Sequence, residues 1–290
     1  MTAAHFPLGL AVDIGGTKIA AALARGPRDL ERLEARTPAA SGPQAVAHEA
    51  ARLVERLLAR TGESVTALGV AATGRVTGGQ VTALNPATMP GWEAFPLPDR
   101  LTALTGLPAV VLNDADAAAW GEYRFGAGAG TRQFLFVTVS TGIGGGLVLG
   151  GKLHTSASGL QADLGFTRDR DGQPLELNAS GRALDRAATA LGWEDARDLM
   201  ARLSTDPRAQ ARLEDACDRL ALKLADLRPL LGLERIAIGG GLGLAPGYLE
   251  TLRARLDALG PGYATPLEPA RLGVDAGLVG ANDWAQAALR

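Results

Sequence analysis

Two stretches of the chain share one pattern of apolar and polar positions. In residues 8–23 an apolar run enters a turn at 13–18, Asp-Ile-Gly-Gly-Thr-Lys, and a second apolar run leaves it. In residues 134–153 the same pattern surrounds a turn at 138–146, Thr-Val-Ser-Thr-Gly-Ile-Gly-Gly-Gly. Apolar, β-prone runs on both sides of a glycine-rich turn predict a β-hairpin. The recurrence about half a chain apart indicates an internal duplication with a cleft between the copies.

Helical and strand patterns alternate between the two hairpins. Apolar residues at helical spacing predict a helix over 45–60, and a buried strand follows at 67–72. Residues 80–92 carry prolines and glycines typical of a loop, residues 98–105 predict a short helix, and 109–112 is a strand. This alternation predicts an α/β fold with buried strands.

The second half of the chain is mainly helical in pattern. The charged residues 168–172 predict an exposed loop. Helices are predicted over 115–123, over 180–230 with breaks near Gly192 and at 204–207, and over 248–259. A strand is predicted at 235–238, and a closing helix follows the small residues at 275–281.

The length of the chain predicts two domains, because 290 residues exceed the usual size of one hydrophobic core. We place the main crossing near the helix that starts at Ala115. Residues 1–114, joined by a C-terminal helix at about 281–290, then form a smaller domain, and residues 115–280 form a larger one.

The charge balance excludes several classes of partner. A formal net charge of −2 leaves no basic field for nucleic acid or for an anionic membrane. No apolar run reaches the length of a membrane span, and residues 1–7 lack the features of a signal peptide, so we expect a cytoplasmic protein that acts on small molecules. Cys217 is the only cysteine and is expected to be a buried core thiol in a helix, which excludes an internal disulfide and a cysteine-cluster zinc site.

The glycine-rich turns have the chemistry of phosphate sites. Glycines let backbone N–H groups approach an anion closely, and Ser140 and Thr141 add hydroxyl donors. A glycine-rich hairpin that binds nothing is the alternative. Walker and Rossmann motifs require a helix directly after the glycines, whereas residues 147–153 have no helical period. Only the glycines at 239–241 lie between a strand and a helix, which favours nucleotide contact there, with a purely structural turn as the alternative.

Five motifs in this order resemble one protein family. They are residues 13–18, Asn113-Asp114, 140–146, 239–241 and 275–281. Together they are similar to the ROK family (repressors, open reading frames and sugar kinases) of the actin-like ATPase superfamily, over nearly the whole chain. The resemblance implies an α/β fold of two actin-like, ribonuclease H-like domains with an ATP and sugar cleft between them, and a homodimer.

The resemblance assigns sugar chemistry to polar residues that follow the strands. Asp114 would be the general base that takes the proton from the attacking sugar hydroxyl, and Asn113 would hydrogen-bond sugar hydroxyls. Each has a structural alternative, Asp114 as the N-cap of the next helix and Asn113 as a turn residue. The implied sugar-binding residues are Asn85, Asn113, Asp114, Asp163 and Glu176.

The resemblance also implies ATP and Mg²⁺. Asp13 would hold Mg²⁺ through water, because Mg²⁺ retains several waters in protein sites, and the alternative is a carboxylate that caps the turn. Lys18 on its own is more typical of a solvated surface charge. The implied ATP-binding residues are Asp13, Gly15, Gly16, Thr17, Lys18, Ser140, Thr141, Gly142, Gly144, Gly240 and Gly241.

One segment departs from the family's pattern. Sugar kinases of the family carry a Glu or His and, three residues later, a His, followed by a cysteine-rich zinc loop. Here Asp163 and Phe166 occupy these positions and the loop is missing, so no zinc is expected. Asp163 and Glu176 can still accept hydrogen bonds from sugar hydroxyls, whereas Phe166 either stacks on the sugar or packs in the core. The shortened loop is either mobile or held by residues 168–171.

These features predict an ATP-dependent kinase for a hexose or N-acetylhexosamine, with N-acetylmannosamine as the first choice of substrate and glucose as the second. A catalytically silent sugar or nucleotide sensor is the alternative from another class, although a pure binder needs no base at Asp114. A transcriptional repressor, the other use of the family, is not expected, because only seven residues precede Leu8 and no basic patch is present.

Overall fold

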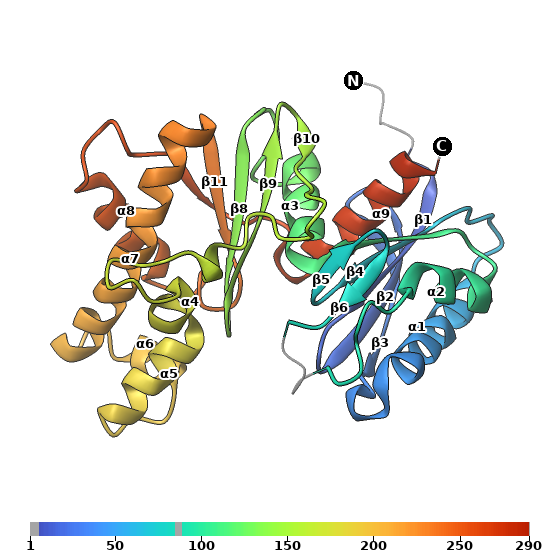
Figure 1. Ribbon diagram of the computed structural model, residues 1–290, viewed down its shortest axis with the longest axis horizontal. Helices are drawn as coiled ribbons and strands as arrows, with labels where there is room; N and C mark the ends of the chain where they lie inside the picture. Colours follow the sequence, from blue (N-terminus) through green and yellow to red (C-terminus); the bar gives the residue numbers. More distant parts are fainter. Residues whose placement is uncertain (1–5, 85–88, 290) are drawn as a thin grey trace. The chain divides into compact units, whose positions relative to one another are not determined.

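The computed structural model describes residues 6–84 and 89–289, and the backbone contacts divide the chain into two units (Figure 1). Unit 1 comprises the described residues within 1–125, 155–160 and 274–290, and unit 2 comprises residues 126–154 and 161–273.

Unit 1 is built on a sheet of five strands in the order β3-β2-β1-β4-β7. The first three strands along the chain form an antiparallel meander, β4 pairs in parallel with β1, and β7 pairs in parallel with β4. A separate two-stranded sheet, β5–β6, follows β4. The strands are β1 Leu8–Ile14, β2 Lys18–Arg25, β3 Arg28–Arg36, β4 Leu68–Ala72, β5 Arg75–Thr77, β6 Gln80–Thr82 and β7 Ala109–Asn113.

Unit 2 repeats the same sheet. Its order is β10-β9-β8-β11-β12, again with an antiparallel meander and with two strands added to the first in parallel. The strands are β8 Phe134–Val139, β9 Ile143–Leu149, β10 Lys152–Leu153, β11 Arg235–Gly239 and β12 Leu267–Pro269. Both predicted hairpins are therefore confirmed, and each is the start of the same α/β arrangement.

Helices cover both faces of the sheet in unit 1. The helices are α1 Gly42–Leu58, α2 Leu97–Thr105, α3 Asp114–Phe125 and α9 Ala276–Ala288. Side chains alternate between the faces of a strand. Leu68 and Val70 accordingly enter the core that α1 and α2 help to form, whereas Gly69 between them lies under α9, where a Cβ would stand 2.1 Å from the Ala281 carbonyl oxygen.

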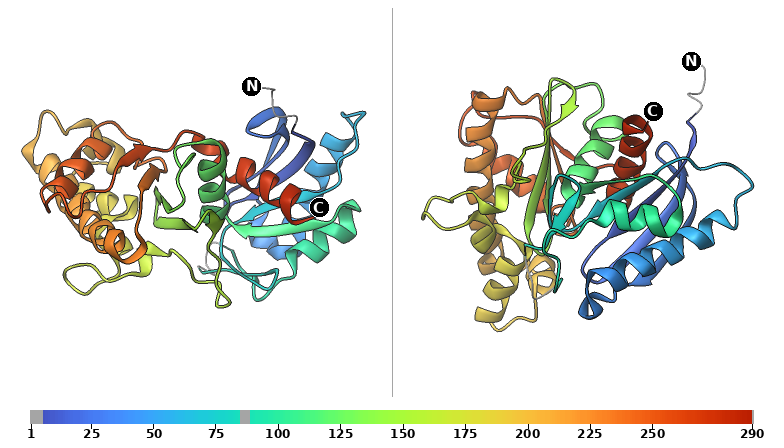
Figure 2. Two further views of the ribbon diagram at one scale, coloured as in Figure 1. Left: turned by 90° about the horizontal axis from the view of Figure 1, so that it is seen from above. Right: turned by 45° about the vertical axis from the view of Figure 1, so that its right-hand side comes forward.

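Helices α3 and α9 pack against each other through small residues (Figure 2). A Cβ on Gly280 would lie 1.7 Å from the Ala117 carbonyl oxygen, and one on Gly121 would lie 2.5 Å from the Ala276 oxygen. This contact explains why α3 and residues 274–280 belong to unit 1, although the sequence boundaries at 114 and 281 assigned them to the larger domain.

The core of unit 2 lies between its sheet and its helices. The helices are α4 Leu175–Ala179, α5 Gly181–Ala190, α6 Ala196–Ala201, α7 Pro207–Leu231 and α8 Tyr248–Asp257. Apolar residues of β8 and β11 pack against one face of α7, where Cys217 is fully buried as predicted. The breaks predicted near Gly192 and at 204–207 separate α5, α6 and α7.

Several local predictions were wrong or incomplete. Strand β3 was not predicted, because its charged sequence has no clear apolar alternation, and the loop predicted over 80–92 contains β6. In the loop predicted to be exposed, Asp169 is buried, because it forms an ion pair with Arg219. Phe166 does not pack in the core, since it is 60% exposed. Among the described residues, no helix combines the length and apolar character needed to cross a bilayer.

Candidate active site

In unit 1, polar residues gather where three parallel strands end. The register pairs Asp13 of β1 with Ala71 of β4, and Ala72 of β4 with Asn113 of β7. Because parallel strands point the same way, the residues that follow them meet at one edge of the sheet. Asp13, Asn113 and Asp114 are thereby brought to this edge.

Asp114 is held by two hydrogen bonds in a partly buried position. The Thr73 hydroxyl donates to Asp114 Oδ2 at 2.9 Å, and the Ala115 N–H donates to Oδ1 at 2.9 Å. Burial raises the pKa of Asp114 above its ordinary value, although hydrogen bonds from Thr73 and Ala115 oppose the shift. A carboxylate with a raised pKa accepts a proton more readily, which suits a general base.

Asn113 provides the side-chain cap at the start of α3. Its Oδ1 accepts from the N–H groups of Ala115 at 2.9 Å and Asp116 at 3.3 Å, and its Nδ2 donates to the Gly74 carbonyl at 2.8 Å. The capping role considered for Asp114 is therefore shared with Asn113. The Asp114 carboxylate is not needed for the cap alone.

Asp13 is the second carboxylate of this edge. Burial, followed by the nearby negative charge of Asp114, raises the pKa of Asp13 to about 7, against the opposing charges of Arg32 and Lys18. Two neighbouring carboxylates create a negative potential that favours the binding of a cation near them. Among the described residues no group of three or more His, Cys, Asp or Glu side chains could hold a metal, but Mg²⁺ needs only one carboxylate with waters and phosphates.

The turn of the first hairpin lies beside a shallow cavity. The Gly15 N–H donates to the Lys18 carbonyl at 3.0 Å, and Gly16 and Thr17 line a hollow of about 730 Å³. The Lys18 ammonium is exposed and forms an ion pair with Glu34 at 3.0 Å. In this structure Lys18 is therefore a surface charge, which is the alternative that we considered for it in the sequence analysis.

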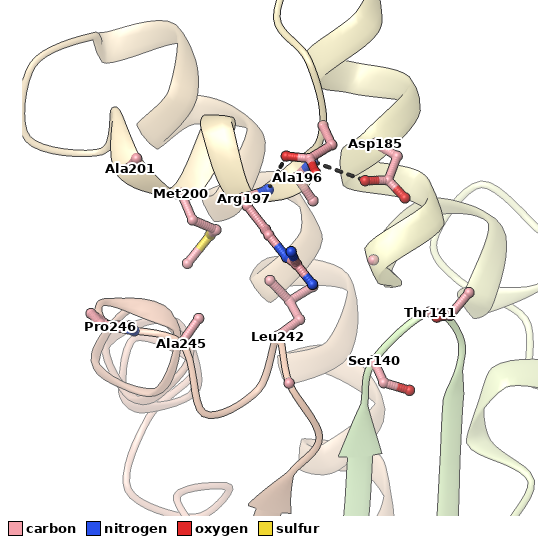
Figure 3. Close-up of a pocket in the computed structure, with 13 residues that line it drawn as sticks. Ser140, Thr141, Asp185, Ala196, Arg197, Met200, Ala201, Leu242, Ala245 and Pro246 are labelled. Carbon is pink, nitrogen blue, oxygen red and sulfur yellow. Dashed lines mark hydrogen bonds between the residues drawn. The ribbon is translucent and has the colours of Figure 1, made fainter. Parts of the chain in front are cut away.

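In unit 2, the turn Ser140–Gly142 faces a pocket of about 840 Å³ (Figure 3). Figure 3 shows Arg197 extending from α6 toward Leu242, with Met200 and Ala245 on the same side of the pocket. The pocket is lined by Ser140, Thr141, Gly181, Asp185, Asp195, Ala196, Arg197, Met200, Ala201, Gly241, Leu242, Ala245 and Pro246. Hydroxyls at one end and apolar side chains at the other suit a nucleotide.

Close backbone packing after β11 requires a glycine at position 240. Gly240 has a φ of 84°, and a Cβ there would lie 2.3 Å from the Val139 carbonyl oxygen. The same oxygen accepts from the N–H groups of Leu242 and Gly243. Gly241 lines the pocket, and a Cβ there would have no neighbour within 4 Å, so Gly240 serves the turn and Gly241 lies at the pocket.

Glu176 on α4 lies against the turn of the second hairpin. Its Oε2 accepts from the Ile143 N–H at 3.1 Å, and a Cβ on Gly142 would lie 2.2 Å from that oxygen. Gly144 lies inside β9 rather than in the turn. Asp163, also in unit 2, is partly buried just before a short 3₁₀ helix. Asn85 lies outside the described residues.

Some residues of these sites had no signal in the sequence. Asp185 Oδ1 accepts from the Ala196 N–H at 2.8 Å, and Asp195 caps α6, so both fix the helix that carries Arg197. A strand over 67–72 was predicted, but the hydrogen bond from Thr73, which follows it, to Asp114 was not. These contacts join segments far apart in the chain, which local patterns do not encode.

Known proteins resemble the chain along nearly its whole length. A family model described as the ROK family matches residues 9–288. The N-acetylmannosamine kinase of Yersinia pseudotuberculosis is 38% identical, with 97% of this chain and 99% of that protein covered. The bifunctional enzyme NanE/NanK of Brucella melitensis is 40% identical over 95% of this chain, which spans 53% of that protein. The crystal structure of a ROK hexokinase from Thermus thermophilus matches with a TM-score of 0.87 at 35% identity, covering 98% of this chain and 99% of that one.

The repeated α/β units and these relatives define the class as ATP-dependent carbohydrate kinases built on the actin-like ATPase fold. Within that class, the chain belongs to the ROK family.

Proposed function

We propose that the protein transfers the γ-phosphoryl group of ATP to a hydroxyl of an N-acetylhexosamine or hexose, with N-acetylmannosamine as the first choice and glucose as the second. The observation that carries the proposal is Asp114, a partly buried carboxylate with a raised pKa that Thr73 and Ala115 hold in one orientation. The order of the two sugars follows the names of the relatives, an N-acetylmannosamine kinase at 38% identity and a ROK family glucokinase at 31%.

In the proposed reaction, the sugar hydroxyl lies at Asp114 and gives it a proton. The hydroxyl oxygen forms a bond to the γ-phosphorus while the bond to the oxygen that bridges the β- and γ-phosphates breaks, which releases ADP. Asn113 can orient neighbouring sugar hydroxyls through its amide, and Asp163 and Glu176 can accept hydrogen bonds from others. Asn85 is proposed to contribute to sugar binding as well.

ATP is proposed to bind through both glycine-rich hairpins. The base and ribose would occupy the pocket that Leu242, Ala245 and Met200 line, next to Gly240 and Gly241. The phosphates would bind the N–H groups and hydroxyls of the turns at 15–18 and 140–142. Mg²⁺, held by Asp13 through water, would neutralise the charge of the phosphates.

The experiment follows sugar phosphate formation and ATP consumption together, with Mg²⁺, over glucose, mannose and their N-acetylamino forms. Turnover on one sugar supports the proposal and identifies the substrate. ATP binding without turnover on any of these sugars instead favours a non-catalytic sensor.

We further propose that the protein acts in the cytoplasm, forms a homodimer and needs no zinc. The last proposal follows from the sequence, which has Phe166 where the family carries a zinc-binding His and lacks the cysteine-rich loop. Size-exclusion chromatography with light scattering tests the dimer, since a monomer mass at micromolar concentration would contradict it.

A further inference from the structure

A buried ion cluster in unit 2 connects α7 to the loop before α4. The Arg219 Nη1 lies 2.6 Å from Asp169 Oδ2 and 2.7 Å from Asp171 Oδ2, and its Nε lies 2.9 Å from Asp215 Oδ2. The side chain of Asp169 is 0% exposed and that of Arg219 is 10% exposed, whereas Asp171 is 56% exposed. Asp169 is thus the one carboxylate of this cluster that is taken fully out of water.

Both carboxylate oxygens of Asp169 accept hydrogen bonds, from its own loop and from α4. Its Oδ1 accepts from the N–H groups of Asp171 at 2.9 Å and Gln173 at 3.0 Å, and its Oδ2 accepts from Asn178 Nδ2 at 2.8 Å. Burial alone would raise the pKa of Asp169, but hydrogen bonds from Asn178, Gln173 and Arg219 outweigh it and lower the pKa to about 2. Asp169 is therefore an ionised anchor at neutral pH.

This anchor reaches the proposed phosphate turn through one short helix. Asn178 lies on α4, two residues after Glu176, and Glu176 accepts the Ile143 N–H at 3.1 Å. Since a Cβ on Gly142 would lie 2.2 Å from the Glu176 carboxylate, the turn and this carboxylate are in direct contact. A shift of α4 would move Glu176 against the turn.

We propose that Asp169 and Arg219 are positioning residues, which act through Asn178 and α4 to hold Glu176 against the Ser140–Gly142 turn. This inference deepens the proposed function, because it rests on that turn binding the phosphates of ATP. In this role Glu176 acts through Oε2, which accepts the Ile143 N–H at the end of the turn.

The cluster contains residues whose substitution can serve as a control. Asp171 and Asp215 contact the same guanidinium as Asp169, but neither is hydrogen-bonded to Asn178. Asp171→Asn therefore removes one charge from Arg219 and leaves the connection to α4 in place. Asn178→Ala does the reverse, because it cuts the connection and leaves the buried ion pair intact.

The test compares Asn178→Ala and Asp169→Asn with Asp171→Asn in the full chain. The first readout is the hydrogen exchange rate of the Ile143 amide without ligand. Loss of a hydrogen bond to a charged group predicts a rise of about tenfold for Asn178→Ala and Asp169→Asn, and of less than about twofold for Asp171→Asn. The amides of β8 should keep their rates in Asn178→Ala.

The second readout is kinetic. A turn that binds ATP equally in the ground and transition states affects KM and not kcat, so Asn178→Ala should raise KM for ATP about tenfold and leave kcat within about twofold. In a Glu176→Ala background, Asn178→Ala should have no further effect on KM, because both act through the same contact.

The two readouts separate the possible failures. If the wild-type protein phosphorylates no sugar, the proposed function fails, and the amide exchange still decides the positioning role. The inference is overturned if Ile143 exchanges at the wild-type rate in Asn178→Ala. It is equally overturned if exchange rises throughout unit 2, since the cluster then only stabilises the fold.

Discussion

Ionisation of Asp13 costs free energy in the folded protein when no cation is bound nearby. The rise of its pKa from 3.8 to about 7 comes first from burial and then from the charge of Asp114. At 1.36 kcal/mol per pKa unit, ionised Asp13 lowers the free energy of unfolding by up to about 4 kcal/mol. Replacing it by the neutral Asn should remove this cost and stabilise the apo protein.

The sign of the pH dependence follows from the raised pKa. Below about pH 4, Asp13 is protonated in the folded and unfolded states and has no effect. As the pH rises, Asp13 ionises first in the unfolded state. The free energy of unfolding therefore falls until Asp13 also ionises in the folded state, near pH 7. The stabilisation by Asp13→Asn should therefore be about 2 kcal/mol at pH 5.5 and reach its full value of about 4 kcal/mol above pH 7.

Urea unfolding at pH 5.5 and pH 8 in EDTA measures this difference. A second series with Mg²⁺ in place of EDTA should stabilise the wild-type protein at pH 8 and leave Asp13→Asn unchanged, because a cation that binds the folded state offsets the buried charge. Asp99→Asn, the same chemical change at an exposed position on α2, is the control. If Asp13→Asn is no more stable than the wild type at pH 8, the argument from charge burial is wrong.

Three further predictions concern packing, nucleotide binding and metal. Gly280→Ala should lower the free energy of unfolding, measured by urea titration, by about 3 kcal/mol, because its Cβ would lie 1.7 Å from the Ala117 oxygen. The control Gly62→Ala, where a Cβ would meet no neighbour, should change the free energy of unfolding by less than about 0.5 kcal/mol. Arg197→Met should raise KM for ATP about tenfold, whereas the exposed Arg212→Met should not, and equal KM values would remove Arg197 from the nucleotide site. Treatment with a zinc-selective chelator should leave the melting temperature and turnover unchanged, and a loss restored only by zinc would contradict the zinc-free assignment.

The hairpins and the sheet edge could be predicted because their signals are local. Each apolar run with its glycine turn lies within about twenty residues of sequence, and the residues after parallel strands must meet at one edge. The sequence therefore placed Asp13 and Asp114 at the ends of strands, whereas their proposed roles came from the family resemblance. The small residues at 275–281 include Gly280, whose missing side chain allows the close approach to Ala117.

The walls of the proposed nucleotide pocket and the support of α4 could not be predicted in the same way. Arg219 and Asp169 are 50 residues apart in sequence, and nothing near Asp169 distinguishes it from its exposed neighbours. A charged run is normally solvated, so only the tertiary structure reveals that one member is buried and paired. Strand β3 was missed for a related reason, since an edge strand tolerates charges that hide its alternation.

The most direct test of the central claim is the kcat of Asp114→Asn on the best sugar substrate, measured beside the affinity for a non-hydrolysable ATP analogue. The isosteric amide keeps the shape of the side chain, and Asn113 still caps α3 through the Ala115 N–H at 2.9 Å, so the fold should be retained. Loss of a general base predicts a fall in kcat of about 10²- to 10⁴-fold with analogue binding unchanged. A kcat within about tenfold of the wild type would contradict the assignment of Asp114 as the base.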